Sequence, residues 1–342
     1  MRLRGLAAAL AAVLAVPPAA VPQGDSGADI RYRLRTTVEL VLVPVTVKDR
    51  QGELVTDLGR EDFTLLENGE PQAIRYFSTD PFPLSAVILV DRALDRDARK
   101  AVERTLPVLT GTLAPGDEVA VMAFDAYPRK ALSFTTDPEA LRQALAHLEL
   151  TAGDPAPPQA SMAAGPMSAG PRINAVPVGP GAPSPAAASP RTVKCLNDAL
   201  FAAGLLLRER EAGRRRVVFL LSDGRNSRLN VHTSEETVAL LLSEDVSVYA
   251  LGVGGARYPR GSGLLADYAR ATGGDVYAPA SQASLEAAHK LAAEQARYQY
   301  TLVYAARPAP GSREFRRIEV NVRRAGVRVQ ARQGYYAGLP EH

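Results

Sequence analysis

The strongest constraint on the fold is an alternation of short apolar runs with amphipathic helical segments over residues 84–297. The runs, apolar apart from Ser85, are 84–90, 119–124, 217–221 and 246–251. A strand that is apolar on both faces belongs in a parallel sheet whose two faces are covered by helices. The alternation therefore predicts a doubly wound, Rossmann-like α/β domain over residues 84–297.

The segments on either side of this domain carry the two-residue period of half-buried strands. In the segment 30–82, one apolar face is formed by the valines at 41, 43, 45 and 47. In the segment 298–338, another is formed by Ile318, Val320 and Val322. Neither segment is large enough to be stable alone, so we predict that the two pair into one β-sandwich into which the α/β domain is inserted.

Composition narrows the classes of protein that fit. Of the 342 residues, 46% are apolar, which suffices for a folded core and excludes a wholly disordered chain. The formal net charge of +3 does not indicate a nucleic-acid partner. A single Cys excludes an intramolecular disulfide or a thiolate metal cluster. Residues 152–190 are mostly Ala, Pro, Gly and Ser, and we predict that they form a disordered insertion.

The first 24 residues have the pattern of a secretory signal peptide. Arg2 and Arg4 precede an apolar run at 6–16, and small residues follow at 17–20. The run is shorter than the ~20 apolar residues that span a bilayer, and no second long apolar segment follows. We therefore expect an exported protein, periplasmic or secreted, without a transmembrane anchor.

Candidate functional residues lie where the predicted strands end. Asp91 directly follows the run 84–90, and Ser222-Asp223-Gly224 follows the run 217–221. Asp95 lies just beyond Asp91, and Lys194 opens the helix that precedes the later strand. In doubly wound sheets the functional crevice lies at the carboxyl ends of the strands, so we expect these side chains to converge.

This combination resembles a von Willebrand factor type A (VWA) domain over residues 84–297. The flanks resemble an exported bacterial group of VWA proteins described from acidobacteria, through residues 45–49, 61–63 and 332–336. The resemblance implies a protein that mediates protein–protein binding or adhesion. It also implies a metal-ion-dependent adhesion site formed by an Asp-x-Ser-x-Ser motif, a Thr and a second Asp.

Asp91 and Asp223 match the two aspartates of that motif, but the other positions depart from it. Ala93 stands in place of the first Ser, Asp95 in place of the second, and Lys194 in place of the Thr. Mg²⁺ and Ca²⁺ prefer oxygen ligands, and an ammonium repels them. We therefore expect a degenerate site within a partner-binding face. The residues of this face are Asp91, Asp95, Lys194, Ser222, Asp223 and Gly224.

Two arrangements of this face remain open from the sequence. Lys194 can lie among Asp91, Asp95 and Asp223 and replace the ion with an internal salt-bridge cluster. Alternatively, the three carboxylates hold Mg²⁺ or Ca²⁺ while Lys194 turns outward. Taken singly, Asp91 and Asp95 also fit helix caps, and Asp223-Gly224 fits a tight turn.

The function expected from these residues is non-enzymatic binding of a protein partner, with no catalytic residue and no cofactor beyond a possible divalent cation. One alternative is a metal-dependent phosphotransfer enzyme or hydrolase with Asp91 as nucleophile and Asp223 as metal ligand. Enzymes resembling the haloacid dehalogenases need a second Asp two residues after the first, where this chain has Ala93. The other alternative is a purely structural component of the cell envelope.

Overall fold

The computed structural model describes residues 39–112, 114–148, 150, 172–173, 176–177, 193–211, 213–254, 263–279, 281–307 and 314–337. The predicted signal peptide, residues 1–24, lies outside them. So does the predicted insertion 152–190, except for the two-residue strands β8 (Arg172–Ile173) and β9 (Val176–Pro177). Among the described residues, none of the helices has the length and apolarity needed to cross a bilayer.

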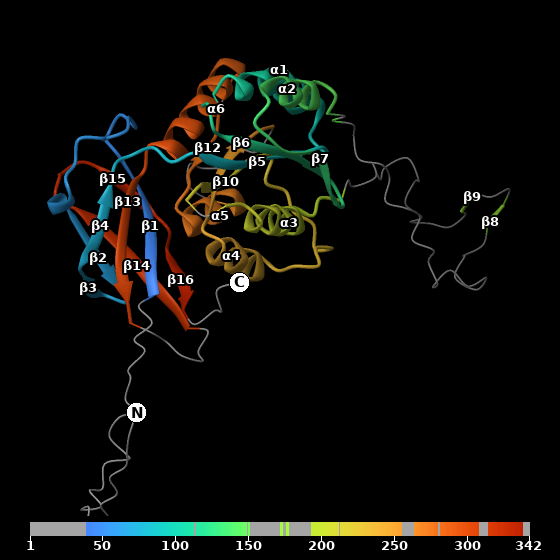
Figure 1. The fold of residues 1–342 in the computed structure, drawn as a ribbon. Helices are drawn as coiled ribbons and strands as arrows, with labels where there is room; N and C mark the ends of the chain where they lie inside the picture. Colours follow the sequence, from blue (N-terminus) through green and yellow to red (C-terminus); the bar gives the residue numbers. More distant parts are fainter. Residues whose placement is uncertain are drawn as a thin grey trace, which may run out of the picture. The chain divides into compact units, whose positions relative to one another are not determined.

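A six-stranded sheet forms the centre of the α/β domain (Figure 1). From edge to edge its strands are β12 (Val276–Tyr277), β11 (Val246–Gly252), β10 (Arg215–Ser222), β5 (Leu84–Asp91), β6 (Glu118–Phe124) and β7 (Pro128–Thr135). The chain runs from β5 toward β7 and then continues with β10 on the other side of β5. The strand order therefore reverses between β5 and β10, where doubly wound sheets bind their ligands.

The edge strand β7 corrects the expectation of a wholly parallel sheet, because it pairs antiparallel with β6. The other neighbouring pairs of this sheet are parallel. Only residues 125–127 separate β6 from β7. A parallel neighbour needs a crossover connection of about a dozen residues or more, so this short loop returns the chain in the opposite direction.

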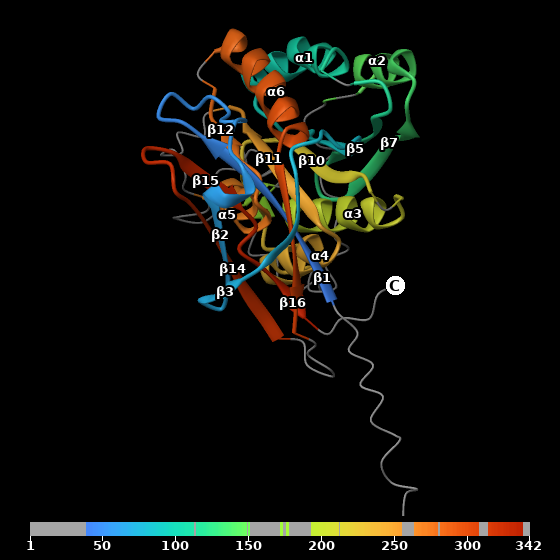
Figure 2. The same cartoon turned by 60° about the vertical axis from the view of Figure 1, so that its left-hand side comes forward.

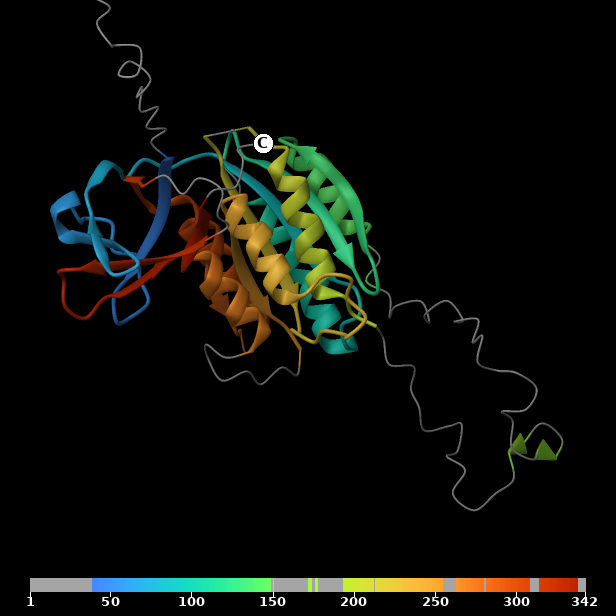
Figure 3. The ribbon, with the colours of Figure 1, turned by 90° about the horizontal axis from the view of Figure 1, so that it is seen from below.

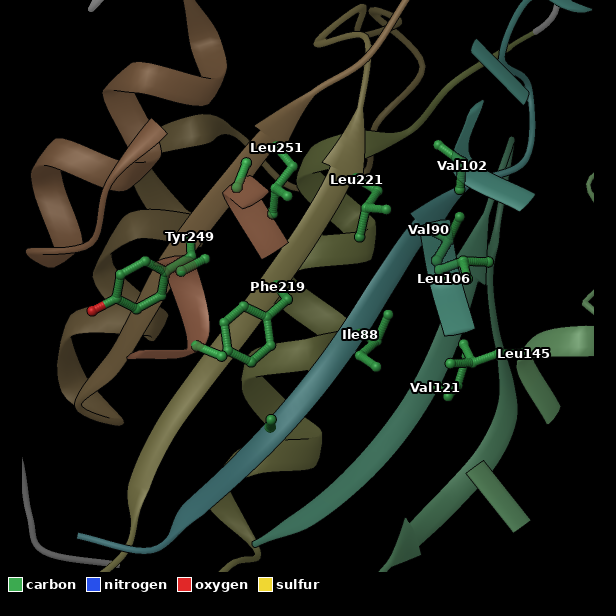
Figure 4. Close-up of a cluster of buried hydrophobic side chains, with 14 of the residues drawn as sticks. Ile88, Val90, Val102, Leu106, Val121, Leu145, Phe219, Leu221, Tyr249 and Leu251 are labelled. Carbon is green, nitrogen blue, oxygen red and sulfur yellow. The ribbon is translucent and has the colours of Figure 1, made fainter. Parts of the chain in front are cut away.

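Helices cover both faces of the sheet (Figure 3). One face packs against α1 (Arg96–Thr110), α2 (Pro138–Ala146) and α6 (Gln282–Arg297). The other packs against α3 (Leu196–Arg208), α4 (Ser234–Ser243) and α5 (Leu264–Thr272). Figure 4 shows the first core, in which Ile88 and Val90 of β5 lie near Val102 and Leu106 of α1. The predicted doubly wound α/β fold is confirmed.

The segments before and after this domain form two antiparallel four-stranded sheets (Figure 2). One contains β15 (Arg328–Ala331), β1 (Glu39–Lys48), β13 (Tyr300–Ala306) and β4 (Ile74–Ser78). The other contains β16 (Gly334–Ala337), β14 (Glu314–Val322), β2 (Phe63–Glu67) and β3 (Glu70–Gln72), with a 3-10 turn at Arg60–Asp62. Both sheets contribute to one buried apolar core. The predicted pairing of the two flanking segments is confirmed by β1 with β13 and by β2 with β14.

Polar contacts join this sandwich to the amino ends of the α/β strands. Arg215, the first residue of β10, donates hydrogen bonds to Gln299 Oε1 at 2.8 Å and Thr301 Oγ1 at 3.0 Å. Lys48 Nζ lies 2.7 Å from Asp275 Oδ2, just before β12. These contacts lie at the amino ends of the strands, so they do not involve the carboxyl ends of β5 and β10.

Candidate functional site

Two acidic residues lie at the carboxyl ends of β5 and β10, the two central strands between which the strand order reverses. Asp91 is the last residue of β5, and Asp223 follows Ser222, the last residue of β10. The strands are in register, with Val90 opposite Leu221. The two carboxylates therefore reach the same edge of the sheet, as the sequence predicted.

Lys194, two residues before α3, extends its ammonium between these carboxylates. Its Nζ lies 2.9 Å from Asp91 Oδ2 and 2.8 Å from Asp223 Oδ2. The side chains of Lys194, Asp91 and Asp223 are 5%, 0% and 8% exposed. Ser222 Oγ donates to Asp91 Oδ2 at 2.9 Å. We call these four residues, Asp91, Lys194, Ser222 and Asp223, the Lys194 cluster.

Backbone groups hold the second oxygen of each carboxylate. Ala93 N donates to Asp91 Oδ1 at 2.9 Å, and Arg225 N donates to Asp223 Oδ1 at 3.0 Å. Each carboxylate therefore binds the ammonium with one oxygen and the backbone with the other. Such a network is rigid, because each side chain is fixed at both ends of its polar group.

Burial raises the pKa of the Asp91 carboxyl above its ordinary value, because the charged form is removed from water. The Lys194 ammonium opposes that rise by stabilising the carboxylate. The cluster places two acidic groups around one ammonium. The Lys194 ammonium therefore provides a positive charge to both buried carboxyl groups.

The remaining residues of the predicted face lie at the rim of the cluster. Asp95 is exposed, and its Oδ1 accepts hydrogen bonds from the backbone of Asp97 at 3.1 Å and Ala98 at 2.9 Å, as a cap of α1. Gly224 N donates to Ser222 Oγ at 3.1 Å. Asp95 still lies close by, since a Cβ added at Gly254 would be 3.1 Å from Asp95 Oδ2 and 3.7 Å from Asp223 Cβ. The cluster thus includes Asp91, Lys194, Ser222 and Asp223, with Asp95 beside it.

The residues at this position do not fit a divalent cation. Among the residues that the structure describes, no three His, Cys, Asp or Glu side chains are grouped so that they could hold a metal ion. Ala93 supplies no side-chain oxygen, and the Lys194 ammonium lies between the two aspartates. An added cation would meet electrostatic repulsion from this ammonium.

Neither Asp91 nor Cys195 is placed to act as a nucleophile. Asp91 is fully buried, and both its oxygens accept hydrogen bonds. Cys195, the residue after Lys194, is 2% exposed, and burial raises the pKa of its thiol. A buried carboxylate and an un-ionised thiol are both poor nucleophiles.

Exposed apolar side chains on the loops around the cluster were missed by the sequence analysis. Leu229 and Val231 lie between β10 and α4 and are 60% and 82% exposed, and Tyr127, between β6 and β7, is 61% exposed. Their loops are short and mostly polar, and carry no periodic pattern. The sequence gives no signal for these exposed residues, because it does not indicate which side chains of a loop point to solvent.

No protein-family model and no curated protein matches this sequence. A von Willebrand factor type A structure from Catenulispora acidiphila is similar at 12% identity and TM-score 0.43, covering 88% of this chain and 74% of that one. An aerotolerance-related membrane protein from Bacteroides fragilis has 15% identity and TM-score 0.40, covering 62% of this chain and 98% of that one. Proximal thread matrix protein 1 from the mussel byssus, with zinc in its MIDAS motif, has 16% identity and TM-score 0.41, covering 68% and 50%. Because these identities and TM-scores are low, the fold assignment rests on the strand order of this chain and not on the similar structures.

Proposed function

We propose that this chain is an exported VWA-type protein that binds a protein partner through the carboxyl-end face of its sheet, without a divalent cation and without catalysis. The Lys194 cluster carries this proposal. It lies at the reversal of strand order, where the VWA resemblance puts the adhesion site. There it supplies a positive charge from the chain itself.

An internal ammonium changes what the face can do. In a metal-dependent adhesion site, an open coordination position accepts a carboxylate from the partner. Here the charge is buried, and it is shared by Asp91 and Asp223. Lys194 therefore stabilises the loops that form the face, and contact with the partner falls to exposed residues around the cluster.

The two alternative functions have less support. A phosphotransfer enzyme or hydrolase would need substrate to reach Asp91, which is fully buried. A purely structural component does not account for exposed Tyr127, Leu229 and Val231 around one strand-end face. Export rests on the predicted signal peptide, with the periplasm or the cell exterior as the location.

Affinity capture with a matched pair of variants tests this function. The mature chain, Lys194→Met and Lys48→Met are immobilised, and an envelope extract of the source cells is passed over each in Mg²⁺ or in EDTA. Lys48 is the control because it is equally buried but pairs with Asp275 near the sandwich. Circular dichroism first establishes that each variant is folded.

We expect the same protein to be retained by the wild type and by Lys48→Met, in equal amounts with and without EDTA. Retention by Lys194→Met should fall at least fivefold, because the loops are no longer tied through the ammonium. Capture that requires Mg²⁺, or no specific capture at all, would contradict the proposal.

A further inference from the structure

The loop between β10 and α4, residues 223–233, presents two apolar side chains to solvent. Leu229 is 60% exposed and Val231 is 82% exposed. Scattered exposed apolar residues are common on protein surfaces. Leu229 and Val231, however, lie two residues apart on one loop that is bonded to the backbone of Lys194, which suggests a binding role.

The backbone of this loop is held firmly where these side chains emerge. Asp198, in the first turn of α3, accepts hydrogen bonds from Val231 N at 2.9 Å and from His232 N at 2.8 Å. The His232 ring stacks on Phe201 of α3, with ring centroids 3.7 Å apart. Val231 is therefore exposed on an ordered backbone.

The first half of the loop is tied to the same helix end. Asn226 Oδ1 accepts from Leu196 N at 3.0 Å, and Asn226 Nδ2 donates to Asn197 Oδ1 at 2.8 Å. Both polar atoms of the Asn226 side chain thus bind the start of α3. Ser227 N donates to the backbone oxygen of Lys194 at 2.7 Å. The loop is connected directly to the Lys194 cluster through this last bond.

Two basic residues precede the apolar ones on this loop. Arg225 and Arg228 are exposed on the same loop. The Arg225 side chain is 80% exposed although its Nε lies 3.7 Å from Asp223 Oδ2, so most of its guanidinium faces solvent. Cys195 N, at the start of α3, donates to Asp125 O at 2.8 Å, so the loop that carries exposed Tyr127 also contacts the start of this helix. We call Tyr127, Arg225, Arg228, Leu229 and Val231 the loop surface.

We infer that the loop surface binds an extended acidic segment of a partner protein, with apolar side chains placed among its carboxylates. This inference rests on the proposed function and names the chemistry of its partner. Guanidinium groups pair with carboxylates, and Tyr and Arg are frequent anchors of protein interfaces. A loop already ordered before binding loses little conformational entropy when the partner arrives.

An anionic membrane is a poorer fit to the same basic and apolar residues. Glu235 and Glu236 are exposed in the first turn of α4, three and four residues after His232. A flat anionic surface that contacted Val231 would also approach these carboxylates and be repelled. A narrow peptide can contact Arg225, Leu229 and Val231 without covering the start of α4.

A peptide selection tests the inference directly, because it does not require the partner protein itself. Random 12-residue peptides displayed on phage are selected on the immobilised mature chain in EDTA, and the recovered peptides are synthesised with a fluorescent label. We expect them to contain several Asp or Glu interspersed with Leu, Ile, Val or Phe. Fluorescence anisotropy then gives Kd for the wild type and for three double variants.

The variants separate the loop surface from other exposed apolar residues. Leu229→Ser/Val231→Ser and Arg225→Glu/Arg228→Glu should each raise Kd at least tenfold. The control Leu40→Ser/Tyr76→Ser removes residues that are 66% and 51% exposed on β1 and β4, and it should change Kd less than twofold. Raising NaCl from 0.05 to 0.5 M should weaken binding of the wild type, because exposed charges are screened.

Several results would overturn the inference. They are a failure to recover any peptide, recovered peptides that lack acidic residues, and a Kd unchanged by the loop variants. Sedimentation with phosphatidylglycerol vesicles that is lost in Arg225→Glu/Arg228→Glu would assign the loop surface to a lipid instead. A protein captured in EDTA whose binding ignores the loop variants would contradict this inference alone. A captured protein that requires Mg²⁺ would contradict the proposed function alone.

Discussion

The two buried lysines of the described residues have opposite charge surroundings. Lys194 lies between two carboxylates, Asp91 and Asp223, at 2.9 and 2.8 Å. At Lys48 the anion is the shared group, because Asp275 Oδ2 is 2.7 Å from Lys48 Nζ and 3.2 Å from Arg328 Nη2. At the first site two carboxylates share one buried ammonium, with the exposed Arg225 Nε 3.7 Å from Asp223 Oδ2. At the second site two cations share one carboxylate.

This difference shows why the two sites should respond differently to the loss of a lysine. Removing Lys48 leaves Asp275 paired with Arg328. Removing Lys194 takes away the ammonium that the two buried carboxyl groups share, and these groups repel each other when both are ionised; the exposed Arg225 Nε, 3.7 Å from Asp223 Oδ2, stays beside one of them. The Lys48 pair joins the sandwich to the α/β domain, whereas the Lys194 cluster joins the loops at the carboxyl ends of β5 and β10.

The largest expected effect is that of Lys194→Met. The free energy of unfolding should fall by about 3–5 kcal/mol, the range for removing one partner of a buried ion pair. Urea denaturation at pH 7 in EDTA measures it. A loss below about 1 kcal/mol would mean that the cluster contributes no more than an exposed ion pair.

Lys48→Met should cost less, about 2 kcal/mol, because Arg328 still binds Asp275 and only the hydrogen bonds of one charged group are lost. The same urea titration gives this value. Equal losses in the free energy of unfolding for Lys48→Met and Lys194→Met would contradict the predicted difference between the two sites.

The pH dependence of the two variants should also differ. In Lys194→Met no ammonium opposes the burial of Asp91, so its pKa should rise further above the usual range. The folded state then binds more protons than the unfolded state above about pH 3.8, and this variant gains stability relative to the wild type as pH falls from 7 to 4.5. The difference in the free energy of unfolding between the wild type and Lys194→Met should therefore narrow as the pH falls over this range.

Buried His289 acts in the opposite direction and serves as an internal reference. Burial lowers its pKa to about 4, so the folded state binds fewer protons than the unfolded state between pH 6.5 and 4. Stability from this group is lost as pH falls through that window, equally in the wild type and in both lysine variants. Comparing urea midpoints at each pH therefore cancels the contribution of His289 and leaves the effect of removing Lys194 from the cluster. A gap between wild type and Lys194→Met that widens on acidification would contradict the account.

The smallest expected effect is that of deleting residues 152–190. This segment ends four residues before Lys194, so its deletion tests whether the Lys194 cluster depends on it. We expect the free energy of unfolding to change by less than about 0.5 kcal/mol, because the composition of this segment predicts a disordered insertion. Far-UV circular dichroism and urea denaturation measure the outcome. Loss of the helical signal would show that the insertion is part of the fold.

The central parts of the site followed from the sequence. The carboxyl ends of parallel strands meet at one edge, so Asp91 and Asp223 were expected together, and Lys194 just before the next helix was expected within reach. Of the two arrangements left open, the structure has the ammonium inside. Asp95 lies beside the cluster because its carboxylate caps α1, a role that short-range sequence also allowed.

The loop surface could not be predicted in the same way. Periodicity reports which strand and helix residues are buried, but a loop such as residues 223–233 has no period. Its order depends on Asp198 and Asn197 of α3, about 30 residues earlier in the chain. The antiparallel direction of β7 was missed because apolar content carries no information on strand direction, which here follows from the short loop at residues 125–127.

The most direct test of the account is calorimetric titration of Mg²⁺ into the mature chain and into Lys194→Thr, with Asp223→Ala as control. We predict no binding to the wild type, because the ammonium already lies between Asp91 and Asp223. Lys194→Thr removes that charge and adds a hydroxyl oxygen, and should bind Mg²⁺. Binding of Mg²⁺ by the wild type that is lost in Asp223→Ala would contradict the claim that Lys194 has taken the place of the cation.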